Sequence, residues 1–260
     1  LITLTPNAYG EIELRAKQMR TTDGLPSNSI RNIYQDSKGF LWLGTLNGLS
    51  RYDGNSFLNF QPEINANGRI SLIDNRINKV IEDQNGFLWI GTGPELYSCY
   101  DLQKSRFVDF TGSGEYEQNY AYSLFASNGD IWLYHRTNGA RHIITKSDRT
   151  MTSVEFKTER GNLPDNRVQF IEEDEAGRIW IGTMRGLAFI SKGDFNIIDR
   201  KNNFIASITH ERDMFFLTDD GYVYWYNTTS GKLSKSAELP AGKIRSNCKF
   251  AFKNQWIIFT

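Results

Sequence analysis

The chain of 260 residues contains only two cysteines, Cys99 and Cys248, which form no C-x-x-C pair and no metal-ligand spacing. Two buried thiols are the simplest interpretation, and the sequence does not decide whether they pair. The three histidines, His135, His142 and His210, are scattered along the chain, and no H-E-x-x-H motif is present. We therefore expect no metal ion and no cofactor.

Net charge is lacking too, because thirty acidic residues balance thirty basic ones. This balance removes the electrostatic argument for a nucleic-acid partner or for an anionic membrane surface. No apolar run reaches the ~18 residues that a membrane span needs, and the first residues lack the features of a signal peptide. Because the chain does not begin with methionine, we expect it to be a mature or excised piece of a longer protein.

Helical periodicity is also absent, since no segment keeps a 3.6-residue apolar period over three turns. What the sequence has instead is an internal repeat of ~43 residues. The segment GFLWLGTLNGL at 39–49 recurs as GFLWIGTGPEL at 86–96, GDIWLYHRTNGA at 129–140 and GRIWIGTMRGL at 177–187. A degenerate fifth copy has Phe215 in the tryptophan place, and a sixth begins at Trp256. The repeat signature consists of Trp42, Trp89, Trp132, Trp180, Gly39, Gly86, Gly129 and Gly177.

Each repeat predicts four short strands. In the first copy these are SIRNIYQD, FLWLGT, GLSRYD and SFLNF, and the turn D-S-K-G joins the first two. Glycine at the end of that turn suits a positive φ. Four antiparallel strands per repeat, with one large aromatic residue each, are typical of a β-propeller, in which the tryptophan fills the wedge between neighbouring blades.

We therefore predict an all-β fold, a single partial β-propeller of about 5.5 four-stranded antiparallel blades. The expected boundaries are an outer closing strand at 10–19, blades at approximately 28–66, 75–112, 119–158, 166–200 and 204–238, and a partial blade at 244–260. Such a piece does not close by itself, and we expect it to belong to a seven-bladed ring.

The segment 23–60 resembles the two-component-regulator propeller repeat. The shared motifs are G-L-P-S-N-S, D-x-x-G-x-x-W-x-G-T and G-L-x-R-Y-D-G. The resemblance covers 20–200 well and the rest of the chain weakly. The third copy departs from the family pattern, because Tyr134 and His135 replace its Gly-Thr.

The resemblance implies the periplasmic sensor region of a hybrid two-component protein, as in gut Bacteroidetes. Such proteins have two seven-bladed propellers and an immunoglobulin-like domain outside the inner membrane, then a membrane helix and cytoplasmic kinase, receiver and DNA-binding domains. Their ligands are typically oligosaccharides released from glycans, and binding shifts a signalling homodimer. This chain would be most of the first propeller, with the remaining extracytoplasmic segments as its partners and no membrane contact of its own. In relatives with a known site the sugar lies near the second propeller, so this piece need not hold it.

Candidate ligand-binding residues come from loops, which carry function on repeat scaffolds. The loop entering each first strand and the loop after W-x-G-T should lie on the same face. The candidates there are Asn47, Arg76, Tyr120, His135, Arg136, Arg167 and Arg185. Arginines with aromatic residues suit a sugar or a carboxylate, while solvated rim residues are the alternative interpretation.

No catalytic residue is expected. The segment GTLNG lacks the G-K-[ST] of a phosphate loop, and D-S-K-G-F-L-W misses the sialidase Asp-box spacing by one residue. The acidic run at 172–175 fits a solvated hairpin better than a glycosidase carboxylate pair. Two alternatives to a sensor remain open, a propeller lyase or hydrolase and a purely structural spacer.

Overall fold

The computed structural model describes residues 2–6, 12–16, 18–62, 72–93, 96–110, 122–210, 212–239, 250–253 and 256–259, with side chains described between 18 and 239. The chain divides into two compact units, unit 1 at 1–109 and unit 2 at 110–260, and each is described by itself. In the described ranges the regular structure is β-strand, apart from two single 3-10 turns, Thr21–Asp23 and Thr158–Arg160.

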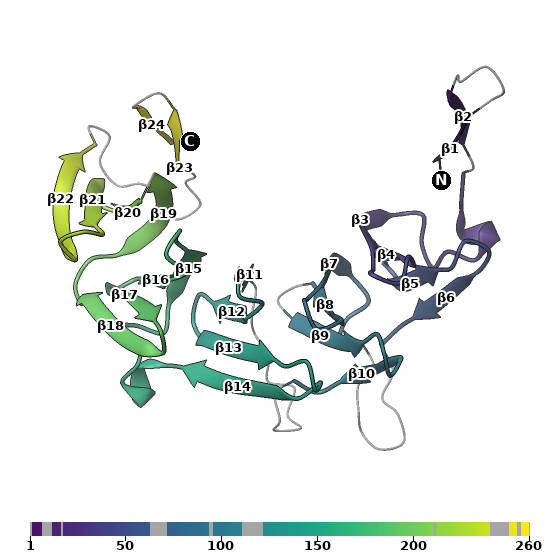
Figure 1. The fold of residues 1–260 in the computed structure, drawn as a ribbon, viewed down its shortest axis with the longest axis horizontal. Coiled ribbons are helices and arrows are strands. Elements are labelled where there is room, and N and C mark those ends of the chain that lie inside the picture. The colour runs from purple at the N-terminus through teal and green to yellow at the C-terminus, as the bar shows by residue number, and fades with distance from the viewer. Residues whose placement is uncertain are drawn as a thin grey trace. The chain divides into compact units, whose positions relative to one another are not determined.

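Unit 1 contains a two-stranded hairpin and two four-stranded sheets (Figure 1). The hairpin pairs β1 (Ile2–Pro6) with β2 (Ile12–Ala16). Sheet 1 is an antiparallel meander of β3 (Ile30–Gln35), β4 (Leu41–Thr45), β5 (Gly48–Tyr52) and β6 (Phe57–Phe60). Sheet 2 is a second meander of β7 (Ile77–Glu82), β8 (Phe87–Thr92), β9 (Leu96–Asp101) and β10 (Arg106–Val108).

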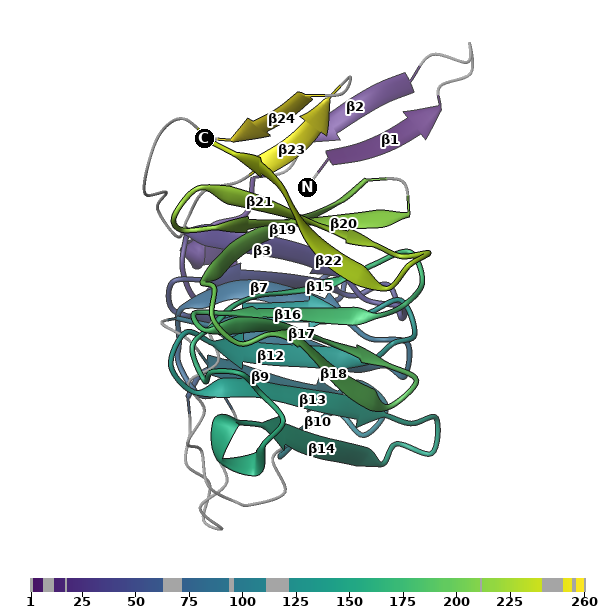
Figure 2. The same cartoon turned by 90° about the vertical axis from the view of Figure 1, so that its left-hand side faces the viewer.

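Unit 2 contains three further meanders, which pack on one another in chain order (Figure 2). Sheet 3 consists of β11 (Tyr122–Phe125), β12 (Ile131–His135), β13 (Gly139–Thr145) and β14 (Met151–Phe156). Sheet 4 consists of β15 (Val168–Glu173), β16 (Ile179–Thr183), β17 (Gly186–Ser191) and β18 (Asp194–Asp199). Sheet 5 consists of β19 (Phe204–His210), β20 (Asp213–Thr218), β21 (Tyr222–Asn227) and β22 (Lys232–Glu238). A pair of strands follows, β23 (Phe250–Lys253) and β24 (Trp256–Phe259).

The predicted fold class, an all-β propeller with four-stranded antiparallel blades, is confirmed by these five sheets. Within 10–19, where a closing outer strand was expected, β2 is paired with β1. The number of blades in a closed ring stays a prediction. Cys248 and part of the expected partial blade at 244–260 lie outside the described residues, whereas Cys99 is buried in β9.

The D-x-x-G turn owes its shape to its aspartate as well as its glycine. In sheet 1, Asp36 Oδ1 accepts hydrogen bonds from the backbone N–H groups of Lys38 and Phe40, and Asp36 Oδ2 accepts one from Trp42 Nε1 at 2.7 Å. Gly39 has a φ of 87°, as expected of the turn. The aspartate therefore joins the hairpin to the buried tryptophan. The same indole bond recurs in sheets 2 and 4, from Trp89 to Asp83 at 2.9 Å and from Trp180 to Asp174 at 2.8 Å.

Sheet 3 lacks this bond, because Ala126 stands in the aspartate place. Trp132 is 1% exposed, and among the described residues its Nε1 has no hydrogen-bond partner. The His142 ring lies parallel to the indole, with the centroids 4.1 Å apart, and His142 Nε2 is 2.9 Å from Asp130 Oδ2. An unpaired buried N–H costs free energy, so the packing around Trp132 must offset that cost.

The tryptophans fill the space between sheets, as predicted. Within unit 1, Trp42 of sheet 1 packs with Val80 and Ile90 of sheet 2. Within unit 2, Trp132 of sheet 3 packs with Ile171 of sheet 4. Burial of these large rings against the next sheet stabilises the stack more than any single hydrogen bond.

In sheet 5 a phenylalanine occupies the position of the tryptophan, and a tryptophan lies on the neighbouring strand. Phe215 occupies the equivalent position on β20, where it pairs with Trp225 of β21. The Trp225 Nε1 donates to Asp213 Oδ2 at 2.8 Å. The indole–carboxylate bond is thus retained in the degenerate copy, with both partners at new positions.

Candidate functional site

In sheets 1 and 4 the two candidate loops lie together at one edge of the sheet, as predicted. Backbone hydrogen bonds join them in sheet 1 (Leu46 N to Ser29 O, 3.2 Å) and in sheet 4 (Met184 N to Arg167 O, 3.0 Å). The Asn28 side chain, in the loop that precedes β3, accepts a hydrogen bond from Thr21 N at 2.9 Å. We name this edge the entry edge.

At the entry edge of unit 1, Asn47 and Arg76 are held by structural contacts. The Asn47 side chain donates to Pro26 O at 3.2 Å and accepts from Asn75 at 3.4 Å. Arg76 Nη2 donates to Asp74 Oδ2 at 3.0 Å and to Gly93 O at 3.2 Å. These contacts fix the loops and favour the rim interpretation at these two positions.

Sheet 4 repeats the arginine clamp of sheet 2. Arg167 donates to both oxygens of Asp165, from Nε at 2.8 Å and from Nη2 at 2.6 Å. The hydrogen bonds from Arg167 hold the pKa of Asp165 below its ordinary value. Arg185 Nε is 3.9 Å from the same carboxylate. Arg76 and Arg167 are therefore one repeat feature, an arginine that closes on the aspartate two residues before it.

The aromatic part of the entry edge is a stacked pair in sheet 3. Tyr122 of β11 pairs with Tyr134 of β12 across the strands, and the ring centroids are 5.2 Å apart at an interplanar angle of 20°. The Arg136 guanidinium lies 5.6 Å from the Tyr122 centroid, and its Nε donates to the Tyr122 hydroxyl at 3.2 Å. Tyr122 is 38% exposed, so this Tyr–Arg platform faces solvent.

The platform is connected to the sheet 4 clamp. Arg136 Nη1 donates to Gln169 Oε1 at 3.5 Å, and Gln169 Nε2 reaches Arg167 O at 3.5 Å. The structure thus brings together Arg136, Arg167 and Arg185, three of the predicted residues, at the entry edge of unit 2.

At the buried base of the platform, the surroundings disfavour the ionised forms of Tyr134 and Glu172. Burial, with a smaller contribution from Glu172, raises the pKa of Tyr134 well above its usual range. Burial likewise raises the pKa of Glu172. Tyr134 is therefore a neutral phenol at physiological pH, suited to stacking and hydrogen bonding rather than to acid–base chemistry.

The remaining candidates divide between a local contact and the undescribed part of the chain. His135 Nδ1 lies 2.8 Å from Thr137 Oγ1 and accepts from Thr137 N at 3.2 Å, so the ring is turned back onto its own hairpin. Tyr120 lies outside the described residues. Sequence reasoning missed Tyr122, which shares the NYAYS segment with Tyr120. Its cross-strand position opposite Tyr134 is the signal that could have identified it.

Two classes of site are not found in the parts of the chain that the structure describes. There is no group of three or more histidine, cysteine, aspartate or glutamate residues that could hold a metal ion. Neither 3-10 turn of the described ranges is long and apolar enough to cross a membrane.

Comparison with known protein families finds a match to three segments of the chain. The family described as "Two component regulator propeller" matches the chain at 24–47, 71–93 and 162–185. Three segments of the chain thus match the two-component regulator propeller repeat. The matched segments span the entry loops, first strands and tryptophan strands of sheets 1, 2 and 4, in which the aspartate of the D-x-x-G turn bonds the repeat tryptophan. No curated protein matches the chain.

Solved structures similar to the chain include two from B. thetaiotaomicron and one from Porphyromonas gingivalis. An extracellular domain of a hybrid two component system is 17% identical, with a TM-score of 0.44 over 94% of this chain and 40% of that one. A second such domain is 20% identical, with a TM-score of 0.48 over 84% of this chain and 31% of that one. PorZ, a surface component of the type-IX secretion system, is 15% identical, with a TM-score of 0.48 over 85% of this chain and 35% of PorZ. The chain thus spans well under half the length of each.

Proposed function

We propose that this chain is a non-catalytic sensor or scaffold segment of a hybrid two-component signalling protein, located outside the cytoplasm. In this role it contributes to the detection of glycan-derived oligosaccharides. The three repeat matches support the protein class. The observation that carries the ligand class is the exposed Tyr–Arg platform at the entry edge of sheet 3.

The platform suits a sugar for physical reasons. A tyrosine ring offers an apolar face with a polar tip, so it packs on the apolar face of a pyranose while its hydroxyl stays hydrogen-bonded. The Arg136 guanidinium supplies several donors in a fixed fork, which match the hydroxyl or carboxylate oxygens of a sugar. Arg136 is held in place by Tyr122 and Gln169, so less of its side-chain entropy is lost on binding.

The signalling role follows from rigidity rather than chemistry. Stacked four-stranded sheets present loops on a stiff frame, and a ligand that binds one arrangement of the full receptor better than another shifts the population between them. On this proposal the chain supplies a binding or docking edge and turns over no substrate. The remaining extracytoplasmic segments of the receptor and a second copy of it are the partners through which the shift would pass.

The test is calorimetry of the chain against a panel of oligosaccharides from plant and host glycans. We expect a saccharide that binds the chain, and at least tenfold weaker binding by Tyr122→Ala, because stacking on that ring is lost. Val154→Ala is the matched control, since Val154 is an exposed apolar residue of β14 away from the platform.

Three outcomes would contradict the proposal. Turnover of any saccharide by the purified chain would make it an enzyme. Binding that Tyr122→Ala leaves unchanged would remove the platform from the site. Binding by a longer extracytoplasmic segment but not by this chain would make it a structural spacer.

A further inference from the structure

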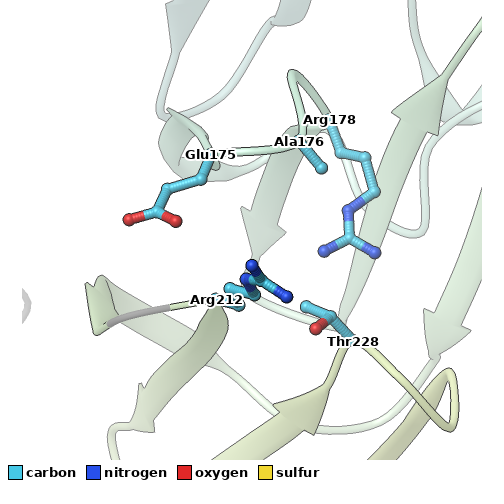
Figure 3. Close-up of a pocket in the computed structure, with 5 residues that line it drawn as sticks. All are labelled: Glu175, Ala176, Arg178, Arg212 and Thr228. Carbon is cyan, nitrogen blue, oxygen red and sulfur yellow. The ribbon is translucent and has the colours of Figure 1, made fainter.

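A pocket of about 300 Å³ opens in unit 2 between sheets 4 and 5, at the edge that carries the D-x-x-G turn of sheet 4. It is lined by Glu175 and Ala176 of the β15–β16 turn, by Arg178, and by Arg212 and Thr228 of two turns of sheet 5 (Figure 3). This edge is opposite the entry edge, because successive hairpins of a meander alternate between the two ends of its strands.

The pocket lies where a repeated contact between sheets is missing. In sheets 1 and 2, Ser37 donates from its N–H and its hydroxyl to the Glu82 carboxylate, at 2.7 and 2.6 Å. In sheets 3 and 4, Ser127 donates to Glu173 in the same way. At the junction of sheets 4 and 5, Glu175 occupies the position of the serine. Thr209 occupies the position of the glutamate, because Thr209 pairs with Met214 in sheet 5 as Glu173 pairs with Ile179 in sheet 4. The serine–glutamate contact cannot form there, and Glu175, in the serine place, lines the pocket instead.

Arg178 forms one wall, at a position that holds phenylalanine in sheets 1 and 2. Its Nε donates to Asp174 Oδ2 at 2.6 Å, and its guanidinium carbon lies 5.3 Å from the Tyr226 ring centroid and 5.6 Å from that of Trp180. Its Nη2 is buried without a hydrogen-bond partner among the described residues. A guanidinium fixed on aromatic rings, with donors unused, is preorganised for a further acceptor.

Arg212 adds donors from sheet 5, whereas the Thr228 hydroxyl already donates to Asp213 Oδ1 at 3.3 Å. Arg212 is exposed, and within the described part of the chain it forms no ion pair. In the view of Figure 3, Arg212 lies between Glu175 on one side and Arg178 and Thr228 on the other. Glu175 extends on the other side of the pocket from Arg178.

The carboxylates near Arg178 already hold other donors. Asp174 also accepts hydrogen bonds from Trp180 Nε1 and from two backbone N–H groups. Asp213 accepts from Trp225 Nε1 and from Thr228 N. Both carboxylates act on Arg178, whereas Arg212 forms no ion pair within the described residues. With Glu175, the charged groups around the pocket sum to one net negative charge, so binding of a ligand here rests on the directed guanidinium donors rather than on net charge.

We propose that this pocket binds the carboxylate group of a small ligand, held between the guanidinium groups of Arg178 and Arg212. A planar carboxylate matches the two-nitrogen face of a guanidinium better than a spherical anion does. The volume admits a small ligand rather than a folded partner. The site is independent of the Tyr–Arg platform, so either proposal can fail alone.

The experiment uses acetate as the probe and acetamide, its uncharged analogue of the same shape, as the control, at constant ionic strength set with chloride. The readout is the ¹⁵N–¹H signal of each tryptophan indole in the whole chain. We expect acetate to move the signals of Trp180 and Trp225, which bond Asp174 and Asp213 beside the pocket. The indole groups of Trp42 and Trp89 form the same type of hydrogen bond in unit 1, away from the pocket, so their signals should not move.

Variants complete the test. Arg212→Gln should weaken acetate binding about tenfold, because it removes one charge-assisted pair of donors. Glu175→Gln should tighten binding about twofold, since it removes an opposing exposed charge. Arg106→Gln, which changes an exposed arginine of unit 1, should have no effect. Equal shifts with acetamide, parallel movement of all four indole signals, or an Arg212→Gln titration identical to that of the wild type would overturn the proposal.

Discussion

Sheets 3 and 4 are neighbours in unit 2 with the same four-stranded plan, yet they differ at both edges. Sheet 4 keeps Asp174 in its turn and Gly182-Thr183 after its tryptophan. Sheet 3 has Ala126 in the first place and Tyr134-His135 in the second. The tryptophans are equally buried, at 1% and 0% exposed, so the core position is kept while the edges diverge.

The glycine explains why this divergence matters. A Cβ at Gly182 would meet the Phe170 ring of its own sheet at 2.1 Å, so a side chain there requires a different strand partner. Sheet 3 has that different partner, since Tyr122 stands opposite Tyr134 and the two rings stack side by side. The comparison teaches that these positions serve close packing in the regular sheets, whereas in sheet 3 the partly buried Tyr134 supports the exposed ring of Tyr122.

The largest expected effect on stability comes from removing the buried tryptophan that both sheets contain. Trp132→Ala and Trp180→Ala should each lower the free energy of unfolding by about 3–5 kcal/mol, because both rings fill the space to the next sheet. Urea melts followed by circular dichroism measure both. A loss in one sheet but not in the other would show that the two wedges are not equivalent.

The next effect comes from converting a regular turn into the turn of sheet 3. Asp36→Ala should lower the free energy of unfolding by about 2–3 kcal/mol, because two backbone N–H groups and the Trp42 indole lose a charged acceptor. Asp53→Ala is the control in the same sheet. Asp53 bonds the backbone of its own exposed turn but no tryptophan, so its loss should be smaller. Equal losses would mean that the indole bond adds nothing.

A smaller effect separates the indole bond from the ring itself. Trp180→Phe should cost about 1–2 kcal/mol more than Trp132→Phe, because only the former leaves a buried carboxylate without its indole donor. Trp132→Phe also removes an N–H group that has no acceptor. The two variants lose similar ring volume, so denaturant melts compare them directly, and identical costs would refute the distinction.

The smallest effect lies at the entry edge of sheet 4. The pKa of Asp165 is lowered in the folded chain by the Arg167 hydrogen bonds. A depressed carboxyl pKa gives stability that is present above the ordinary pKa and is lost as the pH falls through the folded value. Asp165→Asn should therefore be less stable than the wild type near neutral pH, and the gap should shrink in acid. Melts across that range check the sign, and a gap that widens in acid would be inconsistent with the Asp165–Arg167 clamp.

Much of the fold was predictable because the repeat is local and periodic. The spacing around Trp42 and its copies fixes four strands and a glycine turn, and the structure has both. The indole bond could have been suspected from the constant six-residue offset between Asp36 and Trp42. Its loss at Ala126 is visible in the same alignment. The exchange in sheet 5 was not visible, because Trp225 is on a different strand from the position it replaces.

The candidate site was only partly predictable. The two loops were placed correctly on one edge, since loop placement follows from the meander, and a ligand site at that edge stays a prediction. The individual side chains depend on cross-strand register and on ion pairs within the loop. Arg76 and Arg167 are held by aspartates two residues away, and Tyr122 gains its role only from the ring opposite it. Arg178 was not among the predicted residues, and its place in the pocket depends on Arg212 and Thr228 of sheet 5.

The central claim is that an aspartate–indole bond defines the regular sheets and that sheet 3 has lost it. The ¹⁵N–¹H spectrum of the indole groups tests this most directly, because a hydrogen-bonded indole proton resonates at lower field than one without an acceptor. The account predicts low-field signals for Trp42, Trp89 and Trp180, a high-field signal for Trp132, and a low-field shift of that signal in Ala126→Asp. A Trp132 signal that already lies with the other three in the wild type, and that Ala126→Asp does not move, would contradict it.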